Sequence, residues 1–111
     1  MAAPLPVSPL APATLPDLPP LAGLRVASRA AGVRYRGRVD VMLAELAPGS
    51  TLAGVFTRSA TRAAPVLDCE AKIAGPAGDG AAILVNAGNA NAFTGRAGEE
   101  AVAALCSAVA A

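Results

Sequence analysis

The chain has 111 residues, a formal net charge of +1 and no histidine. Its length permits one domain with a modest core, and a charge so close to zero produces no long-range field for nucleic acid or an anionic membrane. Without histidine, the chain lacks the commonest general base and metal ligand. Hydrophobic residues make up 54% of the sequence but aromatic residues only 3%, and small side chains bury little area each. We therefore expect a core that depends on further polypeptide or a partner subunit.

The N-terminal 20 residues contain seven prolines. Proline removes backbone donors and favours extended backbone, so we expect residues 1–20 to be a disordered, proline-rich leader. A passive tail is the expected role and a recruitment peptide the alternative. The leader lacks the basic segment and unbroken apolar run of a signal peptide, and no apolar run in the chain approaches the ~20 residues of a membrane helix. The sequence predicts a cytoplasmic protein.

The folded part, residues 21–111, begins with three predicted strands. Leu24–Ser28 is the first, and the second lies within Val33–Leu46, where alternating arginines predict one polar strand face: Arg34, Arg36 and Arg38. A solvated face is expected, and nucleic-acid binding with Tyr35 as a stacking residue is the alternative. After a turn at Pro48-Gly49-Ser50, Thr51–Thr57 predicts a third strand that pairs with the second as an antiparallel hairpin.

Two helices and a further strand are predicted in the second half. Pro65 opens a helix that extends to Ile73. After a flexible turn at Gly75–Gly80, the apolar run Ala81–Val85 predicts a buried strand. The last helix has apolar residues at helical spacing and no capping residue before Ala111, so we expect a truncated sequence. The predicted order is β-β-β-α-β-α, an α/β fold whose mixed, largely antiparallel sheet packs with helices.

The candidate binding site is the junction between this last strand and helix, Asn86–Gly95, which we call the asparagine-rich junction. It reads Asn-Ala-Gly-Asn-Ala-Asn-Ala-Phe-Thr-Gly. Asparagine and glycine tolerate left-handed backbone, and the N–H groups at a helix start can face a ligand. Asn86, Asn89 and Asn91 either line a substrate cleft or satisfy the backbone of their own turn, and the structural role is the expected one. Thr94 is expected to be an N-cap.

The other polar and reactive residues predict no catalytic site and no metal site. Three aspartates (Asp40, Asp68 and Asp79) are too scattered for a pair of catalytic carboxylates, so solvated or capping roles are expected. Cys69 and Cys106 lack the close spacing of a metal or redox motif. Each cysteine falls on the apolar face of a helix, which predicts two small core residues.

Three blocks of sequence resemble the ornithine acetyltransferase family, also called glutamate N-acetyltransferases. They are Gly54-Val55-Phe56-Thr57-Arg58, Ala63-Ala64-Pro65-Val66 and the asparagine-rich junction, in the order and spacing of the family. Val39-Asp40-Val41-Met42 and Leu84-Val85-Asn86 fit the same pattern, and the likeness covers residues 15–111. The resemblance implies the N-terminal part of the α chain of an arginine-biosynthesis acyltransferase. Such an enzyme moves an acetyl group from N-acetylornithine to glutamate and, in bifunctional members, also from acetyl-CoA to glutamate.

The resemblance also implies a precursor that cleaves itself before a threonine, which becomes the nucleophile at the start of the β chain. The expected assembly is a heterotetramer of two α and two β chains, with acetyl-CoA as a substrate rather than a bound cofactor. The nucleophile, oxyanion hole and substrate-binding residues of the family belong to downstream motifs that nothing here matches. Thr94-Gly95 only looks like the oxyanion pair and is not assigned that role. We therefore expect this chain alone to carry no catalytic residue and to be inactive.

A second hypothesis belongs to a different class of function. The chain would be a freestanding, non-catalytic α/β module that binds a small ligand or a partner at the asparagine-rich junction. The coding sequence downstream distinguishes the two hypotheses, because a continuing frame with the threonine motif supports the acetyltransferase and a genuine stop favours the module.

Overall fold

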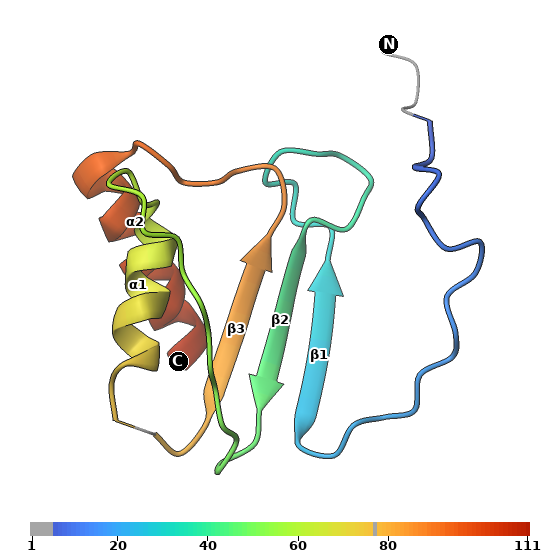
Figure 1. The fold of residues 1–111 in the computed structure, drawn as a ribbon, viewed down its shortest axis with the longest axis horizontal. Coiled ribbons are helices and arrows are strands. Elements are labelled where there is room, and N and C mark those ends of the chain that lie inside the picture. The colour runs from blue at the N-terminus through green and yellow to red at the C-terminus, as the bar shows by residue number, and fades with distance from the viewer. Residues whose placement is uncertain (1–5, 77) are drawn as a thin grey trace.

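The computed structural model describes residues 6–76 and 78–111, which form three strands and two helices (Figure 1). In chain order these elements are β1 (Leu24–Arg29), β2 (Val41–Leu46), α1 (Ala64–Ile73), β3 (Ala81–Asn86) and α2 (Gly95–Ala110). The predicted α/β class, with an antiparallel sheet and packed helices, is confirmed. The order in the described ranges is β-β-α-β-α, which has one strand fewer before α1 than the sequence predicts.

The sheet has the order β1-β2-β3, and both pairs of strands are antiparallel. Val26 lies opposite Ala44 on β2, and Ala44 lies opposite Ile83 on β3. Because side chains alternate between the two faces of a strand, this row defines one side of the sheet. We call that side the apolar face, and its residues are Leu24, Val26, Ser28, Met42, Ala44, Leu46, Ala81, Ile83 and Val85. The opposite side carries the ion pair between Arg25 and Glu45.

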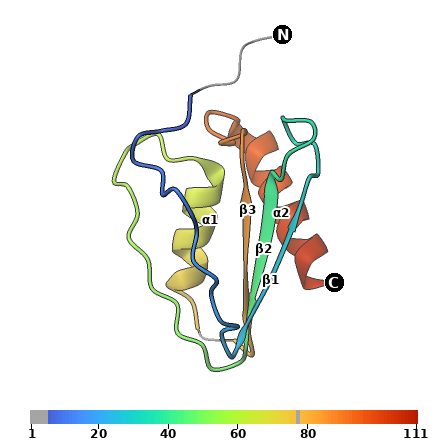
Figure 2. The same ribbon diagram turned by 90° about the vertical axis from the view of Figure 1, so that its right-hand side faces the viewer.

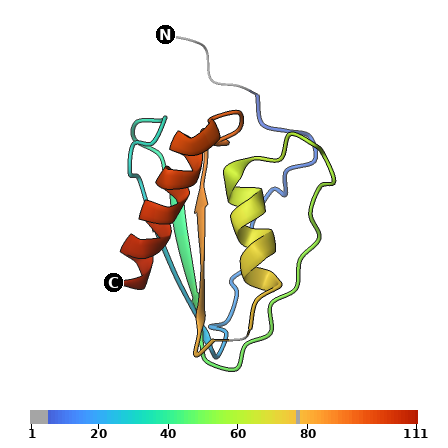
Figure 3. The same cartoon turned by 90° about the vertical axis from the view of Figure 1, so that its left-hand side faces the viewer.

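The two helices lie beyond the outer edge of β3. Viewed edge-on, α1 and α2 are displaced to opposite sides of the plane of the sheet (Figures 2 and 3). The helices contact each other. Pro65 lies in the first turn of α1, where a missing N–H costs nothing, and Lys72 lies in its last turn, where a cation suits the helix dipole.

The described residues bury very little apolar surface. Ala44 is the only buried hydrophobic side chain among them, whereas Val26, Ile83 and Val85 on the apolar face are 58%, 43% and 47% exposed. The prediction that β3 is buried is therefore wrong for these residues, since α1 and α2 lie beside β3 and leave its apolar side chains open. Its uninterrupted apolar run nevertheless forms a strand with the expected bounds, one residue longer at its C-terminal end.

The predicted third strand, residues 51–57, does not form. This segment contains neither helix nor strand in the structure, and Val55 is fully exposed. Alternating side chains indicate extended backbone but do not provide a pairing partner, and both edges of β2 are already occupied by β1 and β3. The predicted hairpin therefore does not form, and β2 pairs instead with β1 and β3, which lie farther away in the sequence. The turn at Pro48-Gly49-Ser50 does form, with Gly49 at φ 82° and a 3.2 Å hydrogen bond from Ser50 N–H to the carbonyl of Ala47.

The predicted polar strand face of arginines is also wrong. Residues 30–40 form a loop, which we call the arginine loop, and β2 starts only at Val41. Gly32 and Gly37 have φ values of 74° and 71°, in the left-handed region that a strand does not use. The guanidinium of Arg38 lies 4.3 Å from the centre of the Tyr35 ring, in cation–π geometry. The ring therefore stacks within the loop.

Two sequence predictions lie partly outside the described residues. The first part of the leader, residues 1–5, is not described, and residues 6–20 contain no helix or strand and are exposed. Disorder of the leader stays a prediction. The turn predicted at residues 75–80 includes position 77, which also lies outside the described ranges, and the positions on either side of it belong to neither α1 nor β3.

Candidate functional site

The three asparagines of the asparagine-rich junction lie together, and their side chains bond within the junction and to the first turn of α2. The Asn86 amide donates to the carbonyl oxygen of Asn89 at 3.0 Å. Asn89 Oδ1 accepts the backbone N–H of Asn91 at 3.2 Å, and Asn91 Nδ2 donates to the carbonyl of Gly98 at 3.0 Å. These bonds support the structural role over the cleft-lining role. Substrate contact by the three residues stays a prediction.

Thr94 occupies the N-cap position of α2, as predicted, but it does not cap the helix with its side chain. Its hydroxyl instead donates to Asn91 Oδ1 at 2.6 Å. Asn91 thus bridges Thr94 and the carbonyl of Gly98, and Gly98 is buried beneath them. A Cβ at Gly98 would collide with Thr94 Oγ1 and would lie 2.6 Å from Asn91 Oδ1. This close approach requires glycine at position 98, and no local sequence pattern predicts that need.

Left-handed backbone shapes the junction, as its asparagines and glycines predict. Asn91, Gly88 and Gly95 have φ values of 46°, 91° and 53°. Phe93 also has a positive φ, 57°, and its side chain is 85% exposed. A bulky residue in this region is strained unless its surroundings hold it there. The composition of the junction did not predict a strained aromatic residue.

The arginine loop packs against the asparagine-rich junction. A Cβ at Gly88 would lie 2.7 Å from Tyr35 Cε2 and 2.9 Å from Arg34 Cβ. Only a residue without a side chain lets these two segments approach so closely, and the φ of Gly88 favours glycine as well. The surface beside the junction is therefore basic and partly aromatic.

Asp40 links the arginine loop to the ends of all three strands. Its carboxylate is only 3% exposed, and it accepts the backbone N–H groups of Ala31 at 2.6 Å and Val33 at 2.7 Å. The backbone N–H of Asp40 donates to the carbonyl of Arg29 at the end of β1. The backbone carbonyl of Asp40 accepts the N–H of Ala87 just after β3. Of the two roles expected of the aspartates, Asp40 has the capping one, because its carboxylate accepts backbone N–H groups of the loop. It is buried and not solvated.

The surroundings of Asp40 favour its charged form. Burial by itself raises the pKa of the carboxyl group, but the backbone N–H groups that point at it, at Ala31 and Val33 above all, outweigh burial and lower the pKa below its usual value. Asp40 is therefore a fixed negative charge in the loop. It has none of the raised pKa that a general acid at neutral pH would need.

A shallow pocket of about 140 Å³ lies between the starts of α1 and α2. Its lining residues are Thr61, Arg62, Ala64, Leu67, Phe93, Thr94, Gly95 and Glu99. The volume is below the roughly 300–1,000 Å³ of sites for drug-sized ligands. Arg62 is paired with Glu70 at 2.6 Å. By itself the pocket can hold a few waters or a small polar group, and it offers no nucleophile with an adjacent base.

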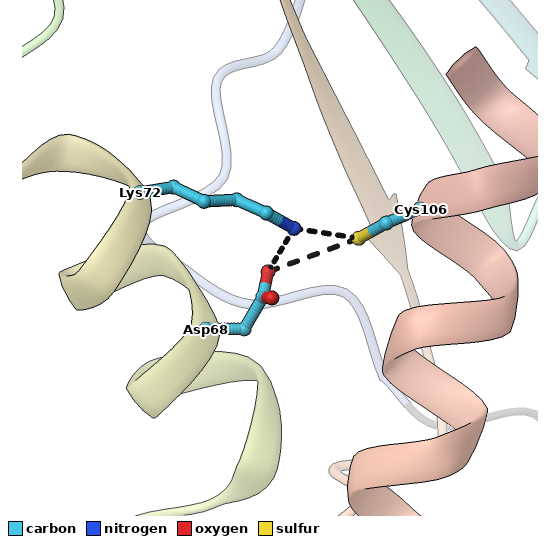
Figure 4. A network of polar contacts seen from close by, with 3 residues as sticks. All are labelled: Asp68, Lys72 and Cys106. Carbon is cyan, nitrogen blue, oxygen red and sulfur yellow. Dashed lines mark hydrogen bonds and ion pairs between the residues drawn. The ribbon is translucent and has the colours of Figure 1, made fainter. Parts of the chain in front are cut away.

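Neither cysteine is a core residue, in contrast to the prediction. Cys69 is exposed and Cys106 is partly exposed. Because α1 and α2 pack on each other beside the sheet, their polar residues meet: Cys106 Sγ lies 3.0 Å from Lys72 Nζ, which itself lies 2.6 Å from Asp68 Oδ2 (Figure 4). Residues from two helices far apart in sequence thus form a polar cluster that sequence spacing did not reveal.

The described ranges contain neither a metal-holding cluster nor a membrane-spanning helix. In residues 6–76 and 78–111, no group of three or more histidine, cysteine, aspartate or glutamate side chains is placed to hold a metal ion. Over the same ranges, no helix has both the length and the apolar character needed to cross a membrane.

Comparison with known proteins places the chain in a family. Residues 25–111 match the ArgJ family. The chain is 66% identical over 104 residues to the arginine biosynthesis bifunctional protein ArgJ of Ruegeria pomeroyi, an alignment that covers 94% of this chain and 26% of the relative. The proteins of the same name from Gluconobacter oxydans and Nitrobacter winogradskyi are 57% and 56% identical, over 91% and 86% of this chain and 23% of each relative.

The chain therefore spans about a quarter of the length of the curated relatives it matches. No solved structure matches it. The family match covers most of the chain and includes every helix and strand except the first residue of β1. On this evidence, the chain belongs to the ArgJ family.

Proposed function

We propose that the chain is the N-terminal part of the α chain of a glutamate N-acetyltransferase of arginine biosynthesis. The observation that carries this proposal is the match of residues 25–111 to the ArgJ family, together with 66% identity to a protein named for arginine biosynthesis. The reaction we propose transfers an acetyl group from N-acetylornithine to glutamate. The word bifunctional in the names of the relatives supports a second acetyl donor, for which we propose acetyl-CoA.

In this proposal the chain is the scaffold of the enzyme, and the reacting groups lie elsewhere. The family resemblance assigns the nucleophilic threonine and the oxyanion hole to downstream motifs, and the relatives are about four times as long as the aligned region. The threonine hydroxyl attacks the acetyl carbonyl of N-acetylornithine and releases ornithine, and the amine of glutamate then takes the acetyl group from the enzyme. Asn86, Asn89 and Asn91 would lie near this site as supporting residues.

The exposed apolar face supports the proposal that the chain assembles with further polypeptide. Val26, Ile83 and Val85 would remain in water if nothing covered them, and a sheet normally buries its apolar face against another layer. We propose that the β chain of the same precursor supplies that layer, in a heterotetramer of two α and two β chains. A cytoplasmic location and the absence of nucleic-acid and membrane partners stay predictions.

The function is tested by joining this chain to the segment of the Ruegeria pomeroyi relative that follows the aligned region. We expect the fusion to convert N-acetylornithine and glutamate to ornithine and N-acetylglutamate, and the 111-residue chain alone to give no turnover. The measurement is ornithine release followed by mass spectrometry. The matched control is the intact relative, which differs from the fusion only in its N-terminal quarter.

Two outcomes would contradict the proposal. Turnover by the chain alone would show that the reacting groups lie within these 111 residues. A soluble fusion that fails to release ornithine, beside an active control, would show that this chain does not support acetyl transfer and would favour a non-catalytic binding module.

A further inference from the structure

The arginine loop carries a concentration of positive charge that no neighbouring side chain balances. Arg34, Arg36 and Arg38 lie within five consecutive residues, and all three are exposed. Within residues 6–76 and 78–111, none of the ion pairs involves these arginines. The loop and the asparagine-rich junction beside it contain a single acidic residue, Asp40.

Asp40 does not neutralise the three arginines. Its carboxylate is buried and accepts the backbone N–H groups of Ala31 and Val33. The backbone N–H groups of Gly32 and Arg34 also lower the pKa of this carboxyl group. Its charge therefore holds the backbone of the loop, and the guanidinium groups project from a backbone tied to a buried anchor.

Tyr35 lies at the centre of the group of arginines. Arg34 and Arg36 flank it in the sequence, and the guanidinium of Arg38 lies 4.3 Å from the centre of its ring. Gly37, at φ 71°, lets the backbone turn between Arg36 and Arg38. A guanidinium over a ring keeps N–H donors at its edge for an anion. The loop thus combines a planar surface with donors that suit phosphate oxygens.

The loop lies against the candidate site. Figure 1 shows the arginine loop and the asparagine-rich junction at the same end of the sheet. The two segments meet at Gly88, where a Cβ would lie 2.7 Å from Tyr35 Cε2 and 2.9 Å from Arg34 Cβ. The acetyl-transfer proposal places the junction near the reacting groups. A ligand held on the loop by one end could therefore extend along the junction with its other end.

The distribution of charge favours a small phosphate ester over nucleic acid. The net charge of the chain is only +1, and a nucleic-acid backbone requires basic residues spread over an extended surface. In the described ranges, the cations that form ion pairs all lie outside the loop. Adjacent guanidinium groups beside an aromatic ring suit a few phosphate groups next to a purine base.

We propose that the arginine loop binds the phosphate groups of acetyl-CoA. The adenine base lies beside the stacked Tyr35 and Arg38 side chains, and the arm that carries the acetyl group extends along the asparagine-rich junction. This inference rests on the proposed function, which includes acetyl-CoA as the second acetyl donor. N-acetylornithine has no phosphate group, so the three arginines serve only one of the two donors.

The experiment uses the fusion that tests the proposed function. Its variant Arg34→Gln/Arg36→Gln removes two charges and keeps the contact between Arg38 and Tyr35. We expect its affinity for CoA, measured by titration calorimetry, to fall about tenfold. The KM for acetyl-CoA should rise by a similar factor, whereas the rate of ornithine release from N-acetylornithine should not change.

Three controls separate charge from structure. Arg34→Lys/Arg36→Lys keeps the charge and should retain part of the affinity for CoA. Arg25→Gln removes an exposed charge at the other end of β1 and should leave that affinity unchanged. Added salt should weaken CoA binding by the parent fusion more than by the glutamine variant, because salt screens charges that the variant lacks. In the parent fusion, ADP should displace CoA more effectively than inorganic phosphate does.

Several results would overturn the inference. These are a parent fusion that does not bind CoA, equal affinity for CoA in the parent and the glutamine variant, and inorganic phosphate that competes as well as ADP. Tighter binding of a single-stranded oligonucleotide than of CoA would overturn it in favour of nucleic acid. A parallel loss of ornithine release in the glutamine variant would show that the arginines act through the structure of the loop.

The two readouts keep this inference separate from the acetyl-transfer proposal. A fusion that releases ornithine, but whose affinity for CoA is the same in every loop variant, refutes the role of the arginine loop alone. A fusion that releases no ornithine, but loses CoA binding in the glutamine variant, refutes acetyl transfer and retains the phosphate site.

Discussion

The variant Asp40→Ala should open the arginine loop and loosen the ends of all three strands. The carboxylate is almost fully buried and accepts two backbone N–H groups, at Ala31 and Val33. Without it, both donors lose their acceptor in a place that water reaches poorly, and this is more costly than the loss of a surface bond. We expect hydrogen exchange at these two amides to accelerate by at least about tenfold and the midpoint of urea unfolding to fall. Asp79→Ala, at an exposed position, is the matched control and should change neither.

The acid dependence of stability provides a second measurement of the same group. The folded-state pKa of Asp40 lies below its unfolded value, so the charged carboxylate contributes stability above the unfolded value. That contribution is lost as pH falls through the folded value, below about pH 4. The Asp40→Ala variant should lack this component of acid destabilisation. If the parent chain and the variant lose stability in parallel on acidification, Asp40 is not the stabilising ion we describe.

Gly98→Ala should destabilise the first turn of α2, although the same exchange stabilises most helices. Alanine in a helix interior normally gains roughly 0.5–1 kcal/mol over glycine. Here the added Cβ would collide with Thr94 Oγ1 and crowd Asn91 Oδ1 at 2.6 Å, and overpacking of this kind costs about 1–3 kcal/mol. The prediction therefore concerns the sign of the change in the free energy of unfolding, measured by urea titration.

A double variant tests the proposed cause. Thr94→Ala removes the hydroxyl that the new Cβ would meet, so Thr94→Ala/Gly98→Ala should recover part of the stability lost in Gly98→Ala. The remaining loss comes from Asn91 Oδ1 and from the Cβ at position 94, which alanine keeps 2.8 Å from the new Cβ. A stabilised Gly98→Ala variant would mean that the turn relaxes freely and that the bonds around Asn91 do not hold it rigidly.

The sequence predicted most accurately the features that depend on neighbouring residues. Pro65 placed the start of α1, the apolar run gave β3, and helical spacing gave α2. Gly88, Asn91 and Gly95 have the positive φ values expected of the asparagine-rich junction. Each of these features follows from backbone preference or side-chain periodicity within a few residues, which a single sequence displays directly.

Features that depend on contacts between distant segments were predicted less well. The alternating pattern of residues 51–57 predicted a strand, but β1 and β3 occupy the two edges of β2. The alternating arginines predicted a strand face, but their segment forms a loop. Two backbone N–H groups of this loop, at Ala31 and Val33, donate to the carboxylate of Asp40. Cys106 was assigned to a core, but it faces a lysine on another helix. In each case a partner outside the local window determined the outcome.

The two outer strands of the sheet differ in a way that affects how the chain behaves in solution. β1 carries Arg25 and Arg29 along its length, whereas β3 reads Ala-Ala-Ile-Leu-Val-Asn and has no charged residue. Charged side chains on an outer strand discourage the addition of a strand from another molecule, and short uncharged segments rich in β-branched and aliphatic residues promote it. The helices α1 and α2 lie beyond the outer edge of the uncharged strand β3, whereas the edge that no helix flanks belongs to the charged strand β1 (Figure 1). Both edges of the sheet should therefore resist the addition of a strand from another chain.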